Sequence, residues 1–287
     1  MILIKKAVAL LFLFITFNSY GQDRFLQVGK DSISIFVEDV GQGKTLLFIP
    51  GWTMTSKFFK KQQSYFKDNY RVIAYDPRGQ GKSSKTSNGN TYATHADDLD
   101  GIIKAMGLKG VVLVGWSSGC ATMYEYVKRY GTENLSHLVF IDEPPKWIGN
   151  VEEEWVYGTF EDYRGGLKSL IGGYDAYLDG IVDWMLVEDF EEDEKEWMLN
   201  QMKMTPKDIA ISLYIDGLTS DYNDVFSKLD EVPMLFMVRE SWYPQVQEWL
   251  NINAPGAKAK AIQSHAAFWE YSVSFNNFLE VFLLNTK

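Results

Sequence analysis

The segment Val111–Cys120, VVLVGWSSGC, joins an uninterrupted apolar run to two serines that lie between two glycines. Four consecutive aliphatic residues without polar alternation are typical of a strand covered on both faces, as in a parallel sheet. The residues that follow, CATMYEYVKRYG, place apolar side chains at helical spacing and end in glycine, which predicts a helix. Ser117 and Ser118 are therefore expected in a strand-to-helix turn, where a tight backbone can hold one side chain exposed.

The five residues from Gly115 to Gly119, GWSSG, match G-x-S-x-G, the nucleophile-elbow pattern, in the strand–turn–helix context that this pattern requires. A serine nucleophile needs a base, and the chain contains three histidines. His95 lies at the start of a predicted helix and His137 at the start of a predicted strand, so both are interpreted as structural or surface residues. His265 lies in a loop before the terminal amphipathic helix, from which it can reach the turn. It is the predicted base.

A tetrahedral intermediate at Ser117 would carry an oxyanion, which needs backbone N–H donors. The amide of Ser118, directly after the nucleophile, is one expected donor. The other is expected from the loop after an earlier strand, LLFIPGWT, where Gly51 permits a tight turn and Trp52 follows. The sequence therefore predicts an oxyanion hole formed by the amides of Trp52 and Ser118.

Strand and helix patterns alternate along most of the chain, which predicts an α/β fold with a mostly parallel sheet flanked by helices. Between residues 146 and 230 helical patterns dominate, the first of them over residues 153–171. We therefore expect residues 22–145 and 231–287 to form the core and residues 146–230 to form a helical cap insertion. The predicted strands are SISIFVED (32–39), TLLFIPG (45–51), YRVIAYD (70–76), VVLVGW (111–116), HLVFIDE (137–143) and MLFMVRE (234–240).

Residues 1–21 have the organisation of a secretory signal peptide. Two lysines precede an apolar run over residues 7–17, and the small residues Ser19 and Gly21 mark a cleavage point. The apolar run is shorter than the roughly 20 residues that a membrane-spanning helix needs. We therefore expect a protein exported to the periplasm or beyond, without a stable membrane anchor.

The composition disfavours several classes of partner. The 287 residues carry a formal charge of −10 and contain no basic cluster, which argues against nucleic acid and anionic membranes as ligands. A hydrophobic content of 46% is enough for a large core. The single cysteine, Cys120, excludes an internal disulfide and is interpreted as a packing residue.

Three further segments resemble the α/β-hydrolase superfamily. LLFIPGWTMTSKFF is similar to its oxyanion-loop segment, YRVIAYDPRGQGKSSK to its Asp-x-Arg-Gly-x-Gly-x-Ser segment, and SHAAFWEYSVSFNNFLEVFL to its terminal histidine loop and helix. The resemblance runs from about Ser32 to the end of the chain and is closest to small carboxylesterases and cofactor-free chloroperoxidase-like serine hydrolases. It implies an eight-stranded sheet with the cap inserted after the sixth strand.

The third member of the triad is where this sequence departs from the resemblance. Many members have a Gly-x-x-Asp pattern after the late strand, but here Arg239 and Trp242 stand at the glycine and aspartate positions. Asp142, at the end of the strand after the elbow helix, is the preferred acid. Glu240, at the end of the late strand, is the alternative, and Glu143 or no acid at all stays open.

The predicted activity is that of an exported serine hydrolase that cleaves carboxylic esters through Ser117, His265 and Asp142. Perhydrolase or lactonase chemistry on the same triad, and a ligand-binding protein with little turnover, are the alternatives. The expected partner is a small-molecule ester, with no metal or organic cofactor and no oligomeric state indicated. The predicted cap contains four tryptophans that are expected to favour apolar or aryl groups: Trp147, Trp155, Trp184 and Trp197.

Cleavage of the leader predicts that the mature protein begins near Gln22, because Ser19 and Gly21 precede that position. Amino-terminal sequencing or intact mass of the exported protein measures this directly. A full-length product retained in the membrane fraction would contradict the prediction.

Overall fold

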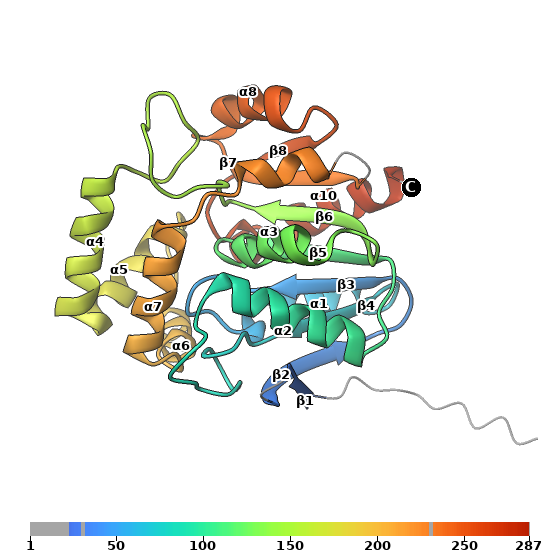
Figure 1. The fold of residues 1–287 in the computed structure, drawn as a ribbon, viewed down its shortest axis with the longest axis horizontal. Helices are drawn as coiled ribbons and strands as arrows, with labels where there is room; N and C mark the ends of the chain where they lie inside the picture. The colour runs from blue at the N-terminus through green and yellow to red at the C-terminus, as the bar shows by residue number, and fades with distance from the viewer. Residues whose placement is uncertain (1–22, 30–31, 230–231, 287) are drawn as a thin grey trace, which may run out of the picture.

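An eight-stranded sheet forms the centre of the computed structural model, which describes residues 23–29, 32–229 and 232–286 (Figure 1). The predicted leader, residues 1–21, lies outside the described residues. The strand order is β1-β2-β4-β3-β5-β6-β7-β8; β2 pairs antiparallel with β1 and β4, and all other pairs are parallel. The strands are β1 (Arg24–Val28), β2 (Ile33–Val40), β3 (Thr45–Ile49), β4 (Arg71–Tyr75), β5 (Val111–Trp116), β6 (Leu135–Ile141), β7 (Met234–Arg239) and β8 (Lys258–Ile262).

The six strands predicted from apolar runs correspond to β2 to β7, and the mostly parallel sheet is confirmed. Every residue of β3 and β5 is buried, as expected for central strands covered on both faces. The two remaining strands, β1 and β8, lie at the two edges of the sheet. Their sequences, RFLQV and KAKAI, interrupt the apolar residues with arginine, glutamine or lysine, so neither contains a continuous apolar run that would predict a buried strand.

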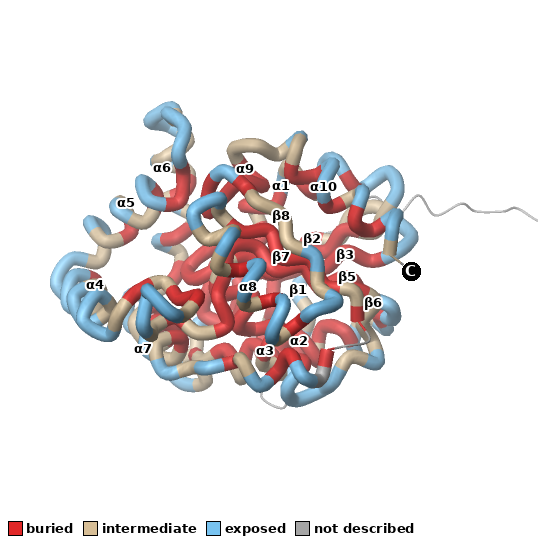
Figure 2. Tube along the Cα trace, turned by 90° about the horizontal axis from the view of Figure 1, so that it is seen from above, coloured by how far each residue is buried: buried red, intermediate tan, exposed pale blue. Residues whose placement is uncertain are grey.

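Helices cover both faces of the sheet. One face carries α2, α3 and α8, and the other carries α1 and α10 (Figure 1). Figure 2 shows the buried residues gathered along the strands and the exposed residues on the outer sides of the helices. No helix in the described ranges is long and apolar enough to cross a membrane. The helices that pack around the sheet are η1 (Ser56–Phe59), α1 (Lys60–Phe66), α2 (Tyr92–Ala105), α3 (Gly119–Tyr130), α8 (Tyr243–Asn253), α9 (Ala267–Glu270) and α10 (Ser272–Asn285).

Four helices between β6 and β7 form a cap at the end of the sheet toward which the parallel strands point (Figure 1). They lie within the segment predicted as a helical insertion, and they follow the sixth strand as the resemblance implies. Loops at this end of the sheet are therefore enclosed between the strand ends and the cap. The cap elements are α4 (Phe160–Gly172), α5 (Tyr174–Met185), α6 (Glu192–Met202) and α7 (Lys207–Leu218), followed by η2 (Asn223–Lys228).

The helix predicted over residues 153–171 is wrong in its first part, because α4 begins only at Phe160. Thr159 and Asp162 form a capping box that starts the helix there: the Thr159 side chain accepts from the Asp162 amide, and the Asp162 carboxylate accepts from the Thr159 amide. Before the cap, Trp155 is buried against aromatic rings of the core instead of continuing a helix.

Candidate active site

The turn after β5 is held in a conformation that requires small residues on either side of Ser117. Ser117 has φ 52°, in the left-handed region that non-glycine residues rarely adopt. A Cβ added to Gly119 would lie 2.3 Å from the Ile49 carbonyl oxygen, and one added to Gly115 would lie 2.9 Å from the Cys120 nitrogen. The glycines of GWSSG therefore allow α3 to begin directly against β3 and β5. Ser117 is half-buried at this turn and lines the cavity.

The loop after β3 lies against the same turn. A Cβ on Gly51 would come within 3.0 Å of the Ser117 Cβ, so the loop passes Ser117 at van der Waals distance. Thr53, with φ 62°, fixes the loop: its amide donates to Gln80 Oε1 at 3.0 Å and its hydroxyl donates to the Trp52 carbonyl at 2.6 Å. In the described chain, neither the Trp52 amide nor the Ser118 amide has a protein acceptor. Both residues line the cavity beside Ser117.

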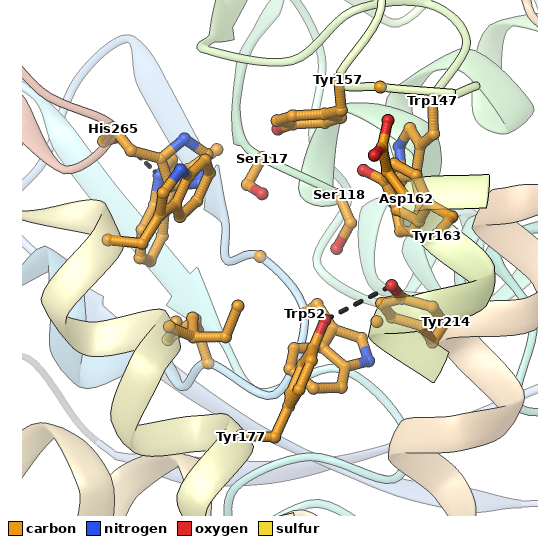
Figure 3. Close-up of a pocket in the computed structure, with 17 residues that line it drawn as sticks. Trp52, Ser117, Ser118, Trp147, Tyr157, Asp162, Tyr163, Tyr177, Tyr214 and His265 are labelled. Carbon is orange, nitrogen blue, oxygen red and sulfur yellow. Dashed lines mark hydrogen bonds between the residues drawn. The ribbon is translucent and has the colours of Figure 1, made fainter. Parts of the chain in front are cut away.

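His265 lies in the loop between β8 and α9 and faces the same cavity as Ser117 (Figure 3). Its carbonyl accepts from the Trp116 indole at 2.8 Å, which ties the loop to the end of β5. Burial lowers the pKa of the imidazole below its ordinary value, although the bond to Asp142 raises it. The neutral form, which can accept a proton, is therefore favoured at neutral pH.

Asp142, and not Glu240, contacts the imidazole. Asp142 Oδ2 lies 2.7 Å from His265 Nδ1, and Asp142 Oδ1 accepts from the Arg239 amide at 2.8 Å. Asp142 directly follows β6, has φ 50° and is fully buried. The Glu240 side chain is exposed at the end of β7 and makes no contact with His265. The preferred acid of the sequence analysis is thus the one that the fold brings to the base.

Glu143, the third acid considered, supports the cavity wall instead. Its Oε1 accepts from the Trp147 indole at 2.5 Å, and its Oε2 lies 2.5 Å from the Tyr157 hydroxyl. Burial raises the pKa of Glu143 to about 8, which favours the protonated acid at neutral pH. A proton on Oε2 can be donated to the Tyr157 oxygen, and the Tyr157 hydrogen is then available to the Asp142 carbonyl at 3.0 Å. All three groups are satisfied by this arrangement.

Arg239 contributes to the site, although no functional role was predicted for it. Its Nε lies 2.7 Å from Asp142 Oδ2 without the alignment of a hydrogen bond, so the two groups form an ion pair. The guanidinium stacks over Trp184 of α5, 4.6 Å from the ring centre, and over Trp242, 4.2 Å away. The Trp184 ring in turn lies 4.5 Å from the His265 ring. Arg239 therefore connects the acid, the cap and the ring that covers the base.

A cavity of about 360 Å³ opens above Ser117, between the strand ends and the cap. Two of the four predicted tryptophans line it, Trp147 and Trp184. The other two serve packing: Trp155 contacts Phe236, and Trp197 stacks on Trp269 at 5.0 Å. The lining residues are Gly51, Trp52, Met54, Trp116, Ser117, Ser118, Trp147, Tyr157, Gly158, Asp162, Tyr163, Gly166, Tyr177, Ile181, Trp184, Tyr214 and His265 (Figure 3).

The two other histidines lie away from this cavity, as expected for structural residues. His95 is buried in α2 with Nε2 3.0 Å from the Arg78 carbonyl oxygen, and burial lowers its pKa to about 4. His137 in β6 lies 3.3 Å from Lys44 Nζ through Nδ1 and 2.9 Å from the Thr286 hydroxyl through Nε2. Neither lines the site.

Comparison with known proteins gives consistent matches. Residues 44–168 match a family model described as the alpha/beta hydrolase fold. The chain is 36% identical over 117 residues to a non-heme chloroperoxidase of Kitasatospora aureofaciens, covering 40% of this chain and 42% of that protein. It is 33% identical over 126 residues to a bifunctional esterase/perhydrolase of Acinetobacter calcoaceticus, covering 43% and 46%. The chain spans about half the length of the curated relatives it matches.

Among the solved structures that match over nearly the whole chain are two with the same degree of similarity. One is an esterase from Exiguobacterium antarcticum and the other a bromoperoxidase from Bacillus anthracis. Each has a TM-score of 0.85 at 22% sequence identity, and each match covers 92% of this chain and 100% of the other. These likenesses confirm the predicted fold, including the eight-stranded sheet and its flanking helices.

Replacing Arg239 with Met should raise the pKa of His265, because the guanidinium beside Asp142 lowers that pKa by repelling the imidazolium. An NMR titration of the His265 ring protons measures the change. Arg239→Lys retains a positive charge near Asp142 and should give a pKa closer to that of the unmodified protein. An unchanged or lower His265 pKa in Arg239→Met, with the fold intact, would refute the assignment.

Proposed function

We propose that this chain, which has the α/β-hydrolase fold, is an exported serine hydrolase that cleaves carboxylic esters. The observation that carries the proposal is the 2.7 Å contact between His265 Nδ1 and Asp142 Oδ2, in a cavity that Ser117 shares with His265. A base held by a buried carboxylate beside a serine in a strained turn is the arrangement that nucleophilic acyl transfer needs.

In the proposed mechanism, Ser117 Oγ attacks the ester carbonyl while His265 Nε2 accepts the hydroxyl proton. Nδ1 of the same ring donates to Asp142, which fixes the tautomer and stabilises the imidazolium that forms. His265 then donates its proton to the leaving alcohol, and an acyl group remains on Ser117. Water, deprotonated by the same ring, releases the acid and restores the serine.

The amides of Trp52 and Ser118 are the proposed oxyanion donors. Neither has a protein acceptor within the described chain, and both residues line the cavity at the turn that holds Ser117. Donors that are fixed before the reaction stabilise the developing charge without reorganisation. Thr53 fixes one of them through its bond to the Trp52 carbonyl, which orients the loop.

Perhydrolysis is a second candidate, favoured by the names of two relatives, the esterase/perhydrolase and the chloroperoxidase. In that reaction hydrogen peroxide replaces water as the acceptor of the acyl group on Ser117, and the product is a peracid. The two activities use the same triad. A peracid assay on the acyl-enzyme with added peroxide measures the partition between them.

A fluorophosphonate should label the protein once, on Ser117, because the reagent traps a serine that a base activates. Intact mass followed by peptide mapping measures the adduct. Ser117→Ala should remain unlabelled, and Ser118→Ala, with its hydroxyl removed from the neighbouring position, should still be labelled. Absence of any adduct on the unmodified protein would favour a ligand-binding protein with little turnover.

Asp142→Asn should reduce turnover on an ester by about 10³–10⁵-fold, because the amide leaves His265 in the wrong tautomer. Glu240→Gln is the matched control: its side chain is exposed and should cost less than about tenfold. Both replacements conserve shape, so equal thermal midpoints would show that the difference is chemical. The opposite ranking, with Glu240→Gln inactive and Asp142→Asn normal, would move the acid to the end of β7.

A further inference from the structure

The cavity lining has an acidic side chain but no basic one to balance its charge. Among the described lining residues are one acid, Asp162, and no Lys or Arg. Asp162 accepts two bonds from Thr159, at 2.8 and 2.6 Å, and both go to Oδ2, which leaves Oδ1 without a protein donor. Figure 3 shows Asp162 on the side of the cavity that holds Trp147 and Tyr163, away from His265. This end of the cavity therefore carries a negative charge.

Aromatic rings surround the same end. Tyr214 is at the centre of the group, with ring centres 5.7 Å from Tyr163, 6.0 Å from Trp52, 6.1 Å from Tyr177 and 6.3 Å from Trp147. The rings meet at different angles, from 29° between Trp147 and Tyr163 to 88° between Trp52 and Tyr177. Aromatic faces carry the negative part of the ring quadrupole, and such enclosures bind organic cations.

Glu143 adds to this effect from behind the wall. It accepts from the Trp147 indole N–H and contacts the Tyr157 hydroxyl, both 2.5 Å away. A carboxyl that accepts from an indole N–H polarises the ring and increases the electron density on its face. The positive end of α4 acts in the opposite direction, but its partial charge of about +0.5 is smaller than the full charge of Asp162.

We propose that the aromatic end of the cavity, formed by Trp52, Trp147, Tyr163, Tyr177 and Tyr214 with Asp162 at its rim, binds a cationic group of the ester, a quaternary ammonium or a protonated amine. This rests on the proposed ester hydrolysis. An uncharged aryl group would fill the same rings without using the carboxylate, and an anionic group would be repelled by Asp162 and by the chain's net charge of −10. Only a cation is attracted both by the faces of the rings and by the carboxylate.

Two esters of the same shape, one charged and one neutral, separate the effect of charge on hydrolysis from the effect of shape. Choline butanoate carries a trimethylammonium group, and 3,3-dimethylbutyl butanoate replaces it with a tert-butyl group of the same shape. The charged ester should have a kcat/KM about tenfold higher, since a cation enclosed by several rings gains stabilisation that its neutral isostere lacks. A ratio of one or below overturns the proposal.

Paired variants test the role of Asp162. Asp162→Asn retains an acceptor for Thr159 but removes the charge, so the ratio of kcat/KM for the charged ester to that for the neutral ester should fall about two- to fivefold. The expected effect is modest because Asp162 is exposed. Glu161→Gln, one residue earlier in α4 and outside the cavity, should leave the ratio unchanged. An equal fall in both variants would mean general steering and would overturn the assignment to this site.

Failure of the hydrolase proposal is separable from failure of the cation site. If neither ester is cleaved, the proposed function is wrong, and binding of tetramethylammonium decides the inference by itself. Quenching of tryptophan fluorescence should then saturate in the unmodified protein and in Ser117→Ala, and should weaken in Asp162→Asn but not in Glu161→Gln. No saturable quenching overturns the proposal.

Discussion

The buried carboxylate of Asp142 is the group on which the site depends. A charge without solvent contact must be compensated by the protein, and two segments far from Asp142 in the sequence do this. His265 comes from the loop after β8, and Arg239 contributes both its amide and its guanidinium from the end of β7. The carboxyl ends of β6 and β7 are adjacent in the sheet, so pairing Asp142 also fixes the relative positions of these strand ends.

The same pairing joins the cap to the catalytic residues. Arg239 stacks on Trp184 of α5, and Trp184 lies against His265, so the cap helix that closes the cavity is connected to the acid through one cation. Glu143, next to Asp142, holds Trp147 and Tyr157 on the opposite wall. Two neighbouring residues at the end of β6 thus organise two sides of the cavity. The walls of the cavity are therefore positioned by residues that directly follow β6.

Backbone strain gathers where the chemistry is proposed. Among the described residues, four non-glycine residues have positive φ, and three of them lie at the site: Thr53, Ser117 and Asp142. Each costs conformational free energy, on the order of 1 kcal/mol, which the surrounding structure must offset. A hydrogen bond holds each of them in place. The Thr53 amide donates to Gln80, the Ser117 amide donates to the Ile141 carbonyl at 2.9 Å, and the Asp142 amide donates to the Met237 carbonyl at 2.8 Å.

The sequence by itself determined the features that leave a local signal. Six strands were evident because central strands are continuous apolar runs, and Ser117 was evident because two glycines must flank a strained turn. The edge strands β1 and β8 left no such signal, since strands open to solvent tolerate lysine and glutamine. Only the tertiary structure decided that Asp142 contacts His265, 123 residues away, and that Arg239 lies between Asp142 and Trp184. Periodicity reports which face of an element is buried. Which strand ends lie side by side at the site depends on the order of the strands in the sheet.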